Sequence, residues 1–269
     1  MADAPDILKR IVAEKWQEIA RRKDAVPTAE LRSLAEQQAS PRGFVRSIAD
    51  TISTGHTAVI AEINKASPSK GVIRKNFVPD SIARDYAEAG ATCLSVLTDE
   101  KFFQGSDDYL KLARDACTLP VLRKDFTVDP YQVFEARAIG ADCILLIVSI
   151  LDAESLSALS SLAREQGLDV LIEVHDQEEL ELALAQGPGL IGINNRNLHT
   201  FSVSLDTTIH LLENIPDDVM VISESGISTR QDVERLVAAG VSGFLVGESF
   251  MRAASPGEQL KKLFSSQPG

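Results

Sequence analysis

The sequence alternates eight times between a short apolar run and a longer amphipathic stretch, and this alternation limits the fold more than any other feature. The apolar runs are rich in strand-forming residues, as expected for strands buried in a parallel sheet. They lie at residues 58–63, 92–97, 121–123, 142–148, 170–174, 190–194, 219–223 and 243–246. Stretches with helical periodicity lie at 79–89, 106–117, 130–139, 153–166, 177–186, 205–213, 229–239 and 256–264.

Eight strand–helix pairs in roughly 200 residues are the number that forms a (β/α)8 TIM barrel. A doubly wound open sheet is the alternative, but no G-x-G-x-x-G follows the first predicted strand. Before the barrel we predict helices at 5–23, at 28–38 with Thr28 as N-cap, and at 44–52. We therefore expect one domain over residues 1–269, in which residues 1–55 form a helical extension packed on the barrel.

Charge and composition exclude several classes of function. The formal net charge of -12 argues against a surface for nucleic acid or an anionic membrane. An acidic protein can still bind a phosphorylated metabolite, because a phosphate site is local and often built from backbone N–H groups. The longest apolar run is far shorter than a membrane span, and the first residues do not resemble a secretory signal. We expect a cytoplasmic protein.

The first apolar run ends in polar residues, and residues 58–71 read AVIAEINKASPSKG. A carboxylate at the end of a buried strand must leave the core or find a partner, because an unpaired buried charge is costly. In this barrel fold the active site lies at the C-terminal ends of the strands. The polar and aromatic residues expected at these ends are Glu62, Asn64, Lys124, Phe126, Glu173, Asn194, Arg196 and Glu224. Their convergence predicts a catalytic site.

Glycines follow the last two predicted strands, in the motifs Ser225-Gly226 and Gly247-Glu248. In barrels, glycines at this place commonly let backbone N–H groups approach a phosphate. We predict a phosphate site there, to which Ser67 adds a hydroxyl; the alternative is that each glycine only makes a turn. The four histidines show neither metal-ligand spacing nor a Ser/Cys–His–Asp set, so we assign them no role and predict no metal, cofactor or covalent nucleophile.

Five motifs, in order along the chain, strongly resemble those of the indole-3-glycerol phosphate synthase family of tryptophan biosynthesis. They are EINKASPSKG at 62–71, LRKDF at 122–126, LIEVH at 171–175, GINNRNL at 192–198 and SESGI at 223–227. The resemblance covers nearly the whole chain. It implies a carboxy-lyase that closes the ring of 1-(o-carboxyphenylamino)-1-deoxyribulose 5-phosphate, with release of carbon dioxide and water. The expected partner is this small phosphorylated substrate, and the expected state is a monomer.

The resemblance also implies roles for single residues. Lys124 would be the general acid at the ribulose carbonyl, Glu173 the general base or stabiliser of a cationic intermediate, and Glu62 a helper in the dehydration. The remaining implied roles are orientation by Asn194 and Arg196, substrate contacts by Ser67, Pro68, Phe126, Glu224 and Ser225, and phosphate binding by Ser67, Gly226, Gly247 and Glu248.

One position departs from the family pattern, because Asn64 stands where the family has a lysine. The neighbouring Lys65 is expected on the opposite face of the strand, since a step of one residue reverses the side-chain direction. Asn64 is thus either a tolerated change or the mark of a weakened or inactive variant. The competing functions are another phosphate-binding barrel, such as phosphoribosylanthranilate isomerase or the tryptophan synthase α subunit, and a barrel that only binds.

Overall fold

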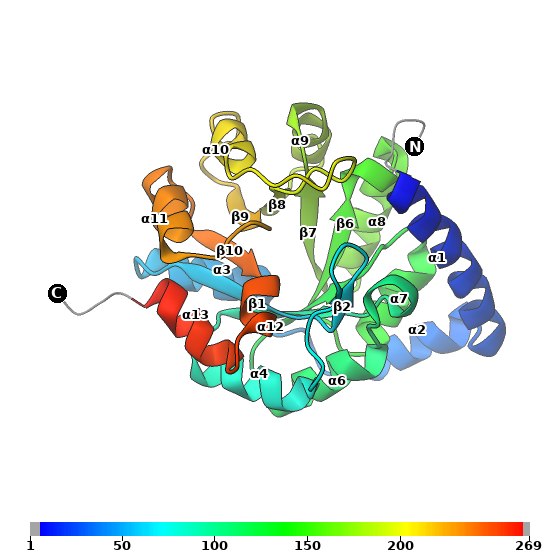
Figure 1. The fold of residues 1–269 in the computed structure, drawn as a ribbon. Helices are drawn as coiled ribbons and strands as arrows, with labels where there is room; N and C mark the ends of the chain where they lie inside the picture. The colour runs from blue at the N-terminus through cyan, green and yellow to red at the C-terminus, as the bar shows by residue number, and fades with distance from the viewer. Residues whose placement is uncertain (1–5, 266–269) are drawn as a thin grey trace.

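Eight parallel strands close into a barrel in the computed structural model, which describes residues 6–265 (Figure 1). Around the barrel the strands follow the order β1-β10-β9-β8-β7-β6-β5-β4, and β4 pairs again with β1. Their bounds are β1 Ala58–Ile63, β4 Cys93–Leu97, β5 Val121–Lys124, β6 Cys143–Ile147, β7 Asp169–Val174, β8 Leu190–Asn194, β9 Met220–Glu224 and β10 Gly243–Val246. The predicted TIM barrel is confirmed.

Helices surround the barrel and follow each strand, as the periodicity predicts (Figure 1). They are α4 Pro79–Glu88, α6 Asp107–Ala116, α7 Pro130–Ala138, α8 Ala153–Glu165, α9 Gln177–Leu184, α10 Asp206–Leu212, α11 Arg230–Ala238 and α13 Pro256–Phe264. Short elements in the loops were not predicted, because they are too brief for a periodic signal. These are the hairpin of β2 Ala66–Ser67 with β3 Gly71–Val72, α5 Glu100–Phe103, the 3-10 turn η1 Val148–Ile150 and α12 Glu248–Arg252.

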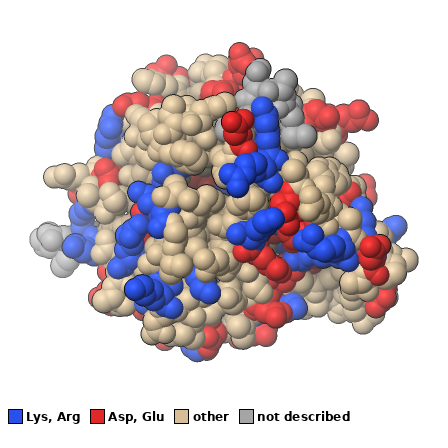
Figure 2. Space-filling model, turned by 45° about the vertical axis from the view of Figure 1, so that its right-hand side comes forward, with Lys and Arg blue, Asp and Glu red and all other residues tan. Residues whose placement is uncertain are grey.

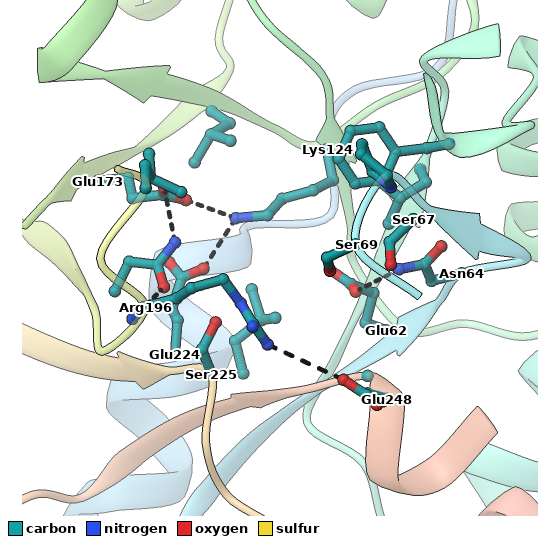
Figure 3. Close-up of a pocket in the computed structure, with 18 of the residues that line it drawn as sticks. Glu62, Asn64, Ser67, Ser69, Lys124, Glu173, Arg196, Glu224, Ser225 and Glu248 are labelled. Carbon is teal, nitrogen blue, oxygen red and sulfur yellow. Dashed lines mark hydrogen bonds and ion pairs between the residues drawn. The ribbon is translucent and has the colours of Figure 1, made fainter. Parts of the chain in front are cut away.

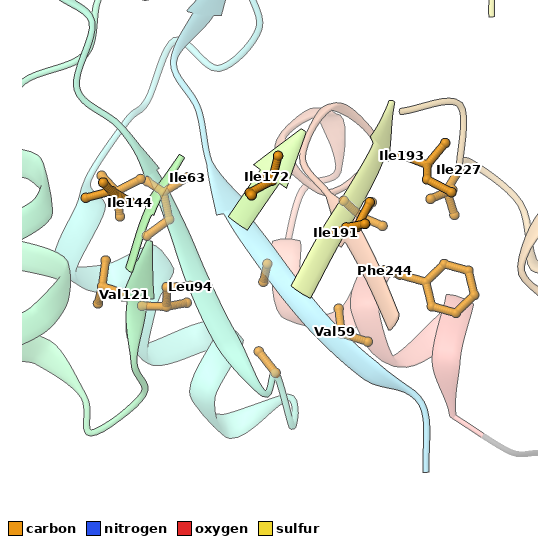
Figure 4. Close-up of a cluster of buried hydrophobic side chains, with 14 of the residues drawn as sticks. Val59, Ile63, Leu94, Val121, Ile144, Ile172, Ile191, Ile193, Ile227 and Phe244 are labelled. Carbon is orange, nitrogen blue, oxygen red and sulfur yellow. The ribbon is translucent and has the colours of Figure 1, made fainter. Parts of the chain in front are cut away.

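Alternate residues of each strand face two separate layers of the core. On β1, Val59, Ala61 and Ile63 belong to the apolar layer between the strands and the outer helices (Figure 4). The intervening Ala58 and Ile60 pack with interior residues of the other strands. Glu62 continues this second, inward series, so the same alternation that fills the barrel also directs the Glu62 carboxylate into its mouth.

Three helices precede β1: α1 Asp6–Ala25, α2 Thr28–Gln37 and α3 Phe44–Ser53. The prediction of Thr28 as an N-cap is wrong, because the extended backbone of Pro27 occupies the cap position and Thr28 is already helical. The predicted start of the first helix at residue 5 lies outside the described residues. None of the described helices is both long and apolar enough to cross a bilayer.

Two opposite ends of the barrel contact this N-terminal segment. Near α3, the backbone N–H groups of Arg42 and Val45 donate to Asp142 and Asp169, which lie at the starts of β6 and β7. These bonds hold α3 against the N-terminal end of the barrel. At the other end, α1 lies across the loops after β4 and β5, and its Leu8 lines the pocket described below.

A buried or partly buried group of charged residues, which we call the α1 clamp, attaches α1 to the barrel. It consists of Lys15, Glu18, Arg22, Asp99, Asp107, Arg123, Asp125 and Glu135. Lys15 is almost fully buried, and its Nζ lies 2.9 Å from Asp125 Oδ1 and 3.2 Å from Asp99 Oδ2. Because both carboxylates are also buried, the Lys15 ammonium is required to compensate their charge.

Candidate active site

All fourteen residues predicted for the site line one cavity of about 230 Å³ at the C-terminal ends of the strands. They are Glu62, Asn64, Ser67, Pro68, Lys124, Phe126, Glu173, Asn194, Arg196, Glu224, Ser225, Gly226, Gly247 and Glu248. The ends of six different strands and the loops after them supply these residues, so only the closed barrel brings them together. Leu8 and Ile11 of α1 also line the cavity and were not predicted, because an apolar residue on an amphipathic helix carries no sequence signal for a site.

Lys124, the last residue of β5, reaches across the cavity to two carboxylates (Figure 3). Its Nζ lies 2.7 Å from Glu173 Oε2 and 2.8 Å from Glu224 Oε2. Burial alone would lower the pKa of Lys124, but the charges of Glu173 and Glu224 outweigh burial and raise it. Lys124 is therefore a protonated ammonium over the whole neutral range, held by one carboxylate on each side.

The two partner carboxylates differ in charge state. Burial would raise the pKa of Glu173, but the Lys124 ammonium and His175 overcome it and hold that pKa well below its usual range. Burial raises the pKa of Glu224 to about 7, because Lys124 offsets only part of the cost and Glu173 adds repulsion. One cation thus faces an ionised carboxylate and a second one whose proton is exchanged near neutral pH.

Glu62 and Asn64 lie side by side on the inward face at the end of β1 (Figure 3). Glu62 accepts hydrogen bonds from Ser95 Oγ at 3.3 Å and from Asn64 Nδ2 at 3.4 Å. Burial raises the pKa of Glu62, and the Lys124 charge offsets this only in part. Asn64 Oδ1 is buried and has no hydrogen-bond partner within residues 6–265. Lys65 is absent from the cavity lining, as the alternation along the strand predicts, so it does not replace a lysine at position 64.

Two residues at the end of β8 contact other parts of the cavity: Asn194 contacts Glu173, and Arg196 lies near Glu248 at the rim. Asn194 Nδ2 donates to Glu173 Oε1 at 3.1 Å, and Asn194 Oδ1 accepts from the Arg196 backbone N–H at 3.0 Å. The Arg196 guanidinium lies 3.9 Å from the carboxylate of Glu248 at the start of α12 (Figure 3). Arg196 is thus oriented toward the start of α12, next to Gly247 after β10.

Two glycines make room for the carboxylates, a role that the sequence pattern did not reveal. A Cβ on Gly247 would lie 2.4 Å from Glu62 Oε1, and a Cβ on Gly192 would lie 2.2 Å from Glu224 Oε1. Gly226 has a φ of 79°, and a Cβ there would lie 2.5 Å from Val203 in the loop after β8. Gly247, which was predicted for phosphate binding alone, also determines where the Glu62 side chain lies.

His175 was assigned no role from the sequence, but it contacts the site. Its Nε2 lies 3.4 Å from Glu173 Oε1, and its Nδ1 lies 2.9 Å from Glu179 Oε2. The signal was present, since residues 173 and 175 are two apart and share a face at the end of β7. No three His, Cys, Asp or Glu side chains within residues 6–265 are grouped as a metal site requires.

Cationic side chains gather locally although the protein is acidic overall. Figure 2 shows Lys and Arg side chains close to a small hollow on one face, while the whole chain has a formal net charge of -12. Beside the cavity, Lys70 Nζ and Arg196 Nη2 each lie 3.9 Å from a Glu248 oxygen. The rim of the cavity therefore offers positive charge to an anionic ligand despite the acidic surface.

Comparison with known proteins agrees with this geometry. The model of the indole-3-glycerol phosphate synthase family matches residues 8–263. Among solved structures, 3-hexulose-6-phosphate synthase from Salmonella typhimurium superposes with a TM-score of 0.62 at 14% identity, over 77% of this chain and 96% of that one. The tryptophan synthase α subunit from Legionella pneumophila str. Paris gives a TM-score of 0.62 at 15% identity, over 84% and 97%. Thiamine phosphate pyrophosphorylase from Pyrococcus furiosus gives 0.59 at 16% identity, over 77% and 93%. At such identities these three structures show the shared barrel fold.

Proposed function

The chain belongs to the indole-3-glycerol phosphate synthase family, whose model covers nearly its whole length, and from this premise we propose that Lys124, Glu173 and Glu62 carry the chemistry. The enzyme is a carboxy-lyase of tryptophan biosynthesis. It closes the ring of 1-(o-carboxyphenylamino)-1-deoxyribulose 5-phosphate to give indole-3-glycerol phosphate, carbon dioxide and water.

One observation supports the assignment of residues most directly: the Lys124 ammonium lies between two carboxylates inside the cavity. In the first step the ring carbon that bears the substrate carboxylate attacks the ribulose carbonyl, and a carbon–carbon bond forms. Negative charge then develops on the carbonyl oxygen. Lys124 donates its proton to that oxygen and leaves a hydroxyl, which is general acid catalysis by a positioned group.

Ring closure leaves positive charge on the ring and its nitrogen until the carboxylate departs. Glu173 is ionised and buried, so its charge stabilises this cation in a medium of low polarity. When carbon dioxide leaves, the electrons of the broken bond return to the ring. Asn194 holds Glu173 Oε1 during this step, which fixes the direction of the carboxylate.

Dehydration then requires one proton for the leaving hydroxyl and the removal of one C–H proton. Burial raises the pKa of Glu62. This favours the protonated acid, which can donate the proton to the leaving hydroxyl. Glu173 removes the C–H proton and returns it to Lys124, whose Nζ is 2.7 Å away. Glu62 regains its proton from solvent, which accounts for the one proton that decarboxylation consumes.

The remaining assignments complete the proposal. Ser67, Gly226, Gly247 and Glu248, the last through its backbone, hold the phosphate, and the cations Lys70 and Arg196 near Glu248 support this placement. Arg196 and Phe126 orient the anthranilate part of the substrate. The protein acts as a cytoplasmic monomer of one domain, with residues 1–55 as its helical extension, and it binds no nucleic acid.

The test uses the purified chain and follows indole fluorescence with the carboxyphenylamino substrate. The wild-type chain should form indole-3-glycerol phosphate, and Glu173→Gln should lower kcat by about 10²–10⁴ because it removes the base. Glu178→Gln, a matched change of an exposed neighbour, should leave kcat within about a factor of two. Equal activity of Glu173→Gln and wild type would refute the role of Glu173, and no product from the wild type would refute its catalytic competence.

A further inference from the structure

His175 contacts the Glu173 oxygen that does not pair with Lys124, and it connects the site to helix α9. Its side chain is only 10% exposed. Nδ1 lies 2.9 Å from Glu179 Oε2 and 3.2 Å from Ser149 Oγ, and Ser149 Oγ donates to the other Glu179 oxygen at 2.5 Å. The backbone N–H of His175 also donates to Glu179 Oε2, at 2.8 Å. The ring is therefore fixed by two elements, η1 and α9.

The opposite edge of the ring faces the catalytic carboxylate. Nε2 is buried and makes no hydrogen bond within the described part of the chain, but it lies 3.4 Å from Glu173 Oε1. Glu173 is thereby approached from three sides, by Lys124 from β5, by Asn194 from β8 and by His175 from the end of β7. The strand-end pattern predicted Lys124 and Asn194 at the same mouth as Glu173, but it did not predict His175 there.

The charges around His175 favour its protonated form. Burial alone would lower the pKa of His175, but the charge of Glu173 together with the hydrogen bond and charge of Glu179 outweighs burial and raises the value to about 10. Glu173 on β7 and Glu179 on α9 face the ring directly, and Lys124 lies beyond Glu173. A second cavity beside the ring is also lined by the charged or titratable side chains Asp176, Glu178, Arg196 and His199. An imidazolium between two carboxylates satisfies both of them.

We propose that His175 is a positioning residue of the reaction, which is anchored by Glu179 and holds the Glu173 carboxylate toward Lys124 in its ionised form. This inference rests on the proposed role of Glu173 as stabiliser and base. Among the described residues, His175 does not line the catalytic cavity, so it acts through Glu173 and touches no reacting atom. A purely structural role would only attach α9 to the barrel, so the test must read out the ionisation of Glu173.

The decisive measurement is the pH profile of kcat in His175→Gln, compared with wild type. Glutamine can still reach Glu173 with an amide N–H but carries no charge. Loss of the cation should move the acidic limb of the profile to higher pH by about one unit, which lowers kcat about tenfold on that limb and much less above neutral pH. KM should change less than kcat, because Glu173 acts mainly in the transition state.

Glu179→Gln is the second variant, and it keeps the inference testable if the His175 variant folds poorly. Removing the Glu179 charge should shift the acidic limb of the kcat profile to higher pH by a smaller amount, whereas Glu178→Gln should leave that limb in place. A limb that stays at its wild-type pH in both His175→Gln and Glu179→Gln would overturn the inference. If Glu173→Gln is inactive in that case, only the role of His175 fails; if Glu173→Gln is fully active, the proposed role of Glu173 and the inference fail together.

Stability gives an independent readout of the charge on His175. The pKa of the folded state is about 10, above the unfolded value of about 6.5. The stabilisation from His175 is therefore fully present below pH 6.5 and is lost as the pH rises through about 10. The difference in free energy of unfolding between wild type and His175→Gln should shrink over this window, and a difference that does not vary with pH would contradict a charged imidazole.

Discussion

The α1 clamp and the catalytic cluster of Lys124, Glu173, Glu224 and Glu62 meet at the end of β5, and they are built differently. Consecutive residues of this strand end take part in both. Arg123 and Asp125 point outward into the clamp, whereas Lys124 points inward to Glu173 and Glu224. The side-chain alternation of one strand thus separates a structural ion network from a reactive one.

The clamp is satisfied by the protein alone. Asp125 forms an ion pair with Lys15 and accepts hydrogen bonds from the Thr98 hydroxyl and the Phe126 backbone N–H. Asp99 caps the N-terminus of the short helix α5. Burial would raise the pKa of Asp125, but Lys15 and Arg123 hold it well below its usual range. Charge and hydrogen bonding together outweigh the cost of burial at this place, which is the condition for a buried ion network that stabilises a fold.

The catalytic cluster is incompletely satisfied. Of the four buried side-chain polar atoms without a hydrogen bond in residues 6–265, three lie in or against the site: Asn64 Oδ1, His175 Nε2 and Glu224 Oε1. The pKa values of Glu62 and Glu224 are raised, in contrast to that of Asp125. Unpaired buried polar atoms cost free energy. Their concentration here indicates that the cluster is arranged for a ligand and the clamp for the fold.

The largest expected effect on stability concerns the clamp. Lys15→Met leaves Asp99 and Asp125 buried without their ammonium partner, so the free energy of unfolding should fall by about 3–5 kcal/mol at neutral pH. Urea denaturation measures this directly. The matched control is Lys101→Met, which removes an exposed pair with Glu14 and should cost less than about 1 kcal/mol. If the two variants were equally stable, the clamp would not be a stabilising network.

The next effect concerns the space beside Glu62. Gly247→Ala places a methyl group 2.4 Å from Glu62 Oε1, so the carboxylate must move. A displacement of about 1 Å can lower kcat by as much as about 10²-fold. Gly189→Ala is the control, because a Cβ there meets nothing within 4 Å. A rise in KM at unchanged kcat would instead show that Gly247 serves only the phosphate.

Asn64→Lys should sharpen the contrast in charge between the two clusters. A lysine at this buried position would place a second cation next to Glu62 and make the cavity less negative toward its anionic substrate. We expect kcat to rise by roughly tenfold, with a smaller change in KM. Asn64→Met controls for side-chain length. Equal kcat of wild type and Asn64→Lys would show that Asn64 is a tolerated change and that Lys124 already supplies the proton.

The smallest effect is a pH dependence of stability that has opposite signs for Glu224 of the catalytic cluster and Asp125 of the clamp. Glu224 has a folded pKa of about 7, above its usual 4.5, so its contribution to stability is present below pH 4.5 and lost as the pH rises through about 7. Asp125 has a lowered pKa, so its contribution is present above pH 3.8 and lost as the pH falls through its folded value.

Unfolding of Glu224→Gln and Asp125→Asn tests these signs against wild type. Wild type should lose stability relative to Glu224→Gln as the pH rises from 4.5 to 7, by at most about 1.4 kcal/mol per pH unit. Relative to Asp125→Asn it should lose stability as the pH falls below 3.8. The same sign in both variants would contradict the opposite pKa shifts of Glu224 and Asp125.

Much of the site could be predicted from the sequence because strand alternation is a strict rule. Four charged residues of the site lie at predicted strand ends: Glu62, Lys124, Glu173 and Glu224. Eight predicted strand–helix pairs indicate a (β/α)8 barrel, in which the C-terminal ends of all strands meet at one mouth. The exclusion of Lys65 from the cavity follows from the same rule. Local periodicity and one topological rule were sufficient for these residues.

The remaining features depend on contacts between distant segments, which no local pattern encodes. The clamp joins Lys15 to Asp99 and Asp125 across more than 80 positions of sequence. The role of Gly192 is visible only once Glu224 from the next strand is placed against it. His175 was missed because its significance comes from Glu179 on α9 as well as from Glu173. Thr28 failed as a cap because the preceding proline already has the capping backbone conformation.

The most direct test of the central claim is the turnover of Lys124→Ala at saturating substrate. If Lys124 is the proton donor of the catalytic cluster, kcat should fall by about 10²–10⁴, while the unfolding midpoint in urea shifts less than it does in Lys15→Met. A Lys124→Ala enzyme that retained more than about a tenth of wild-type turnover would contradict the claim, because that loss lies well below the range for a general acid.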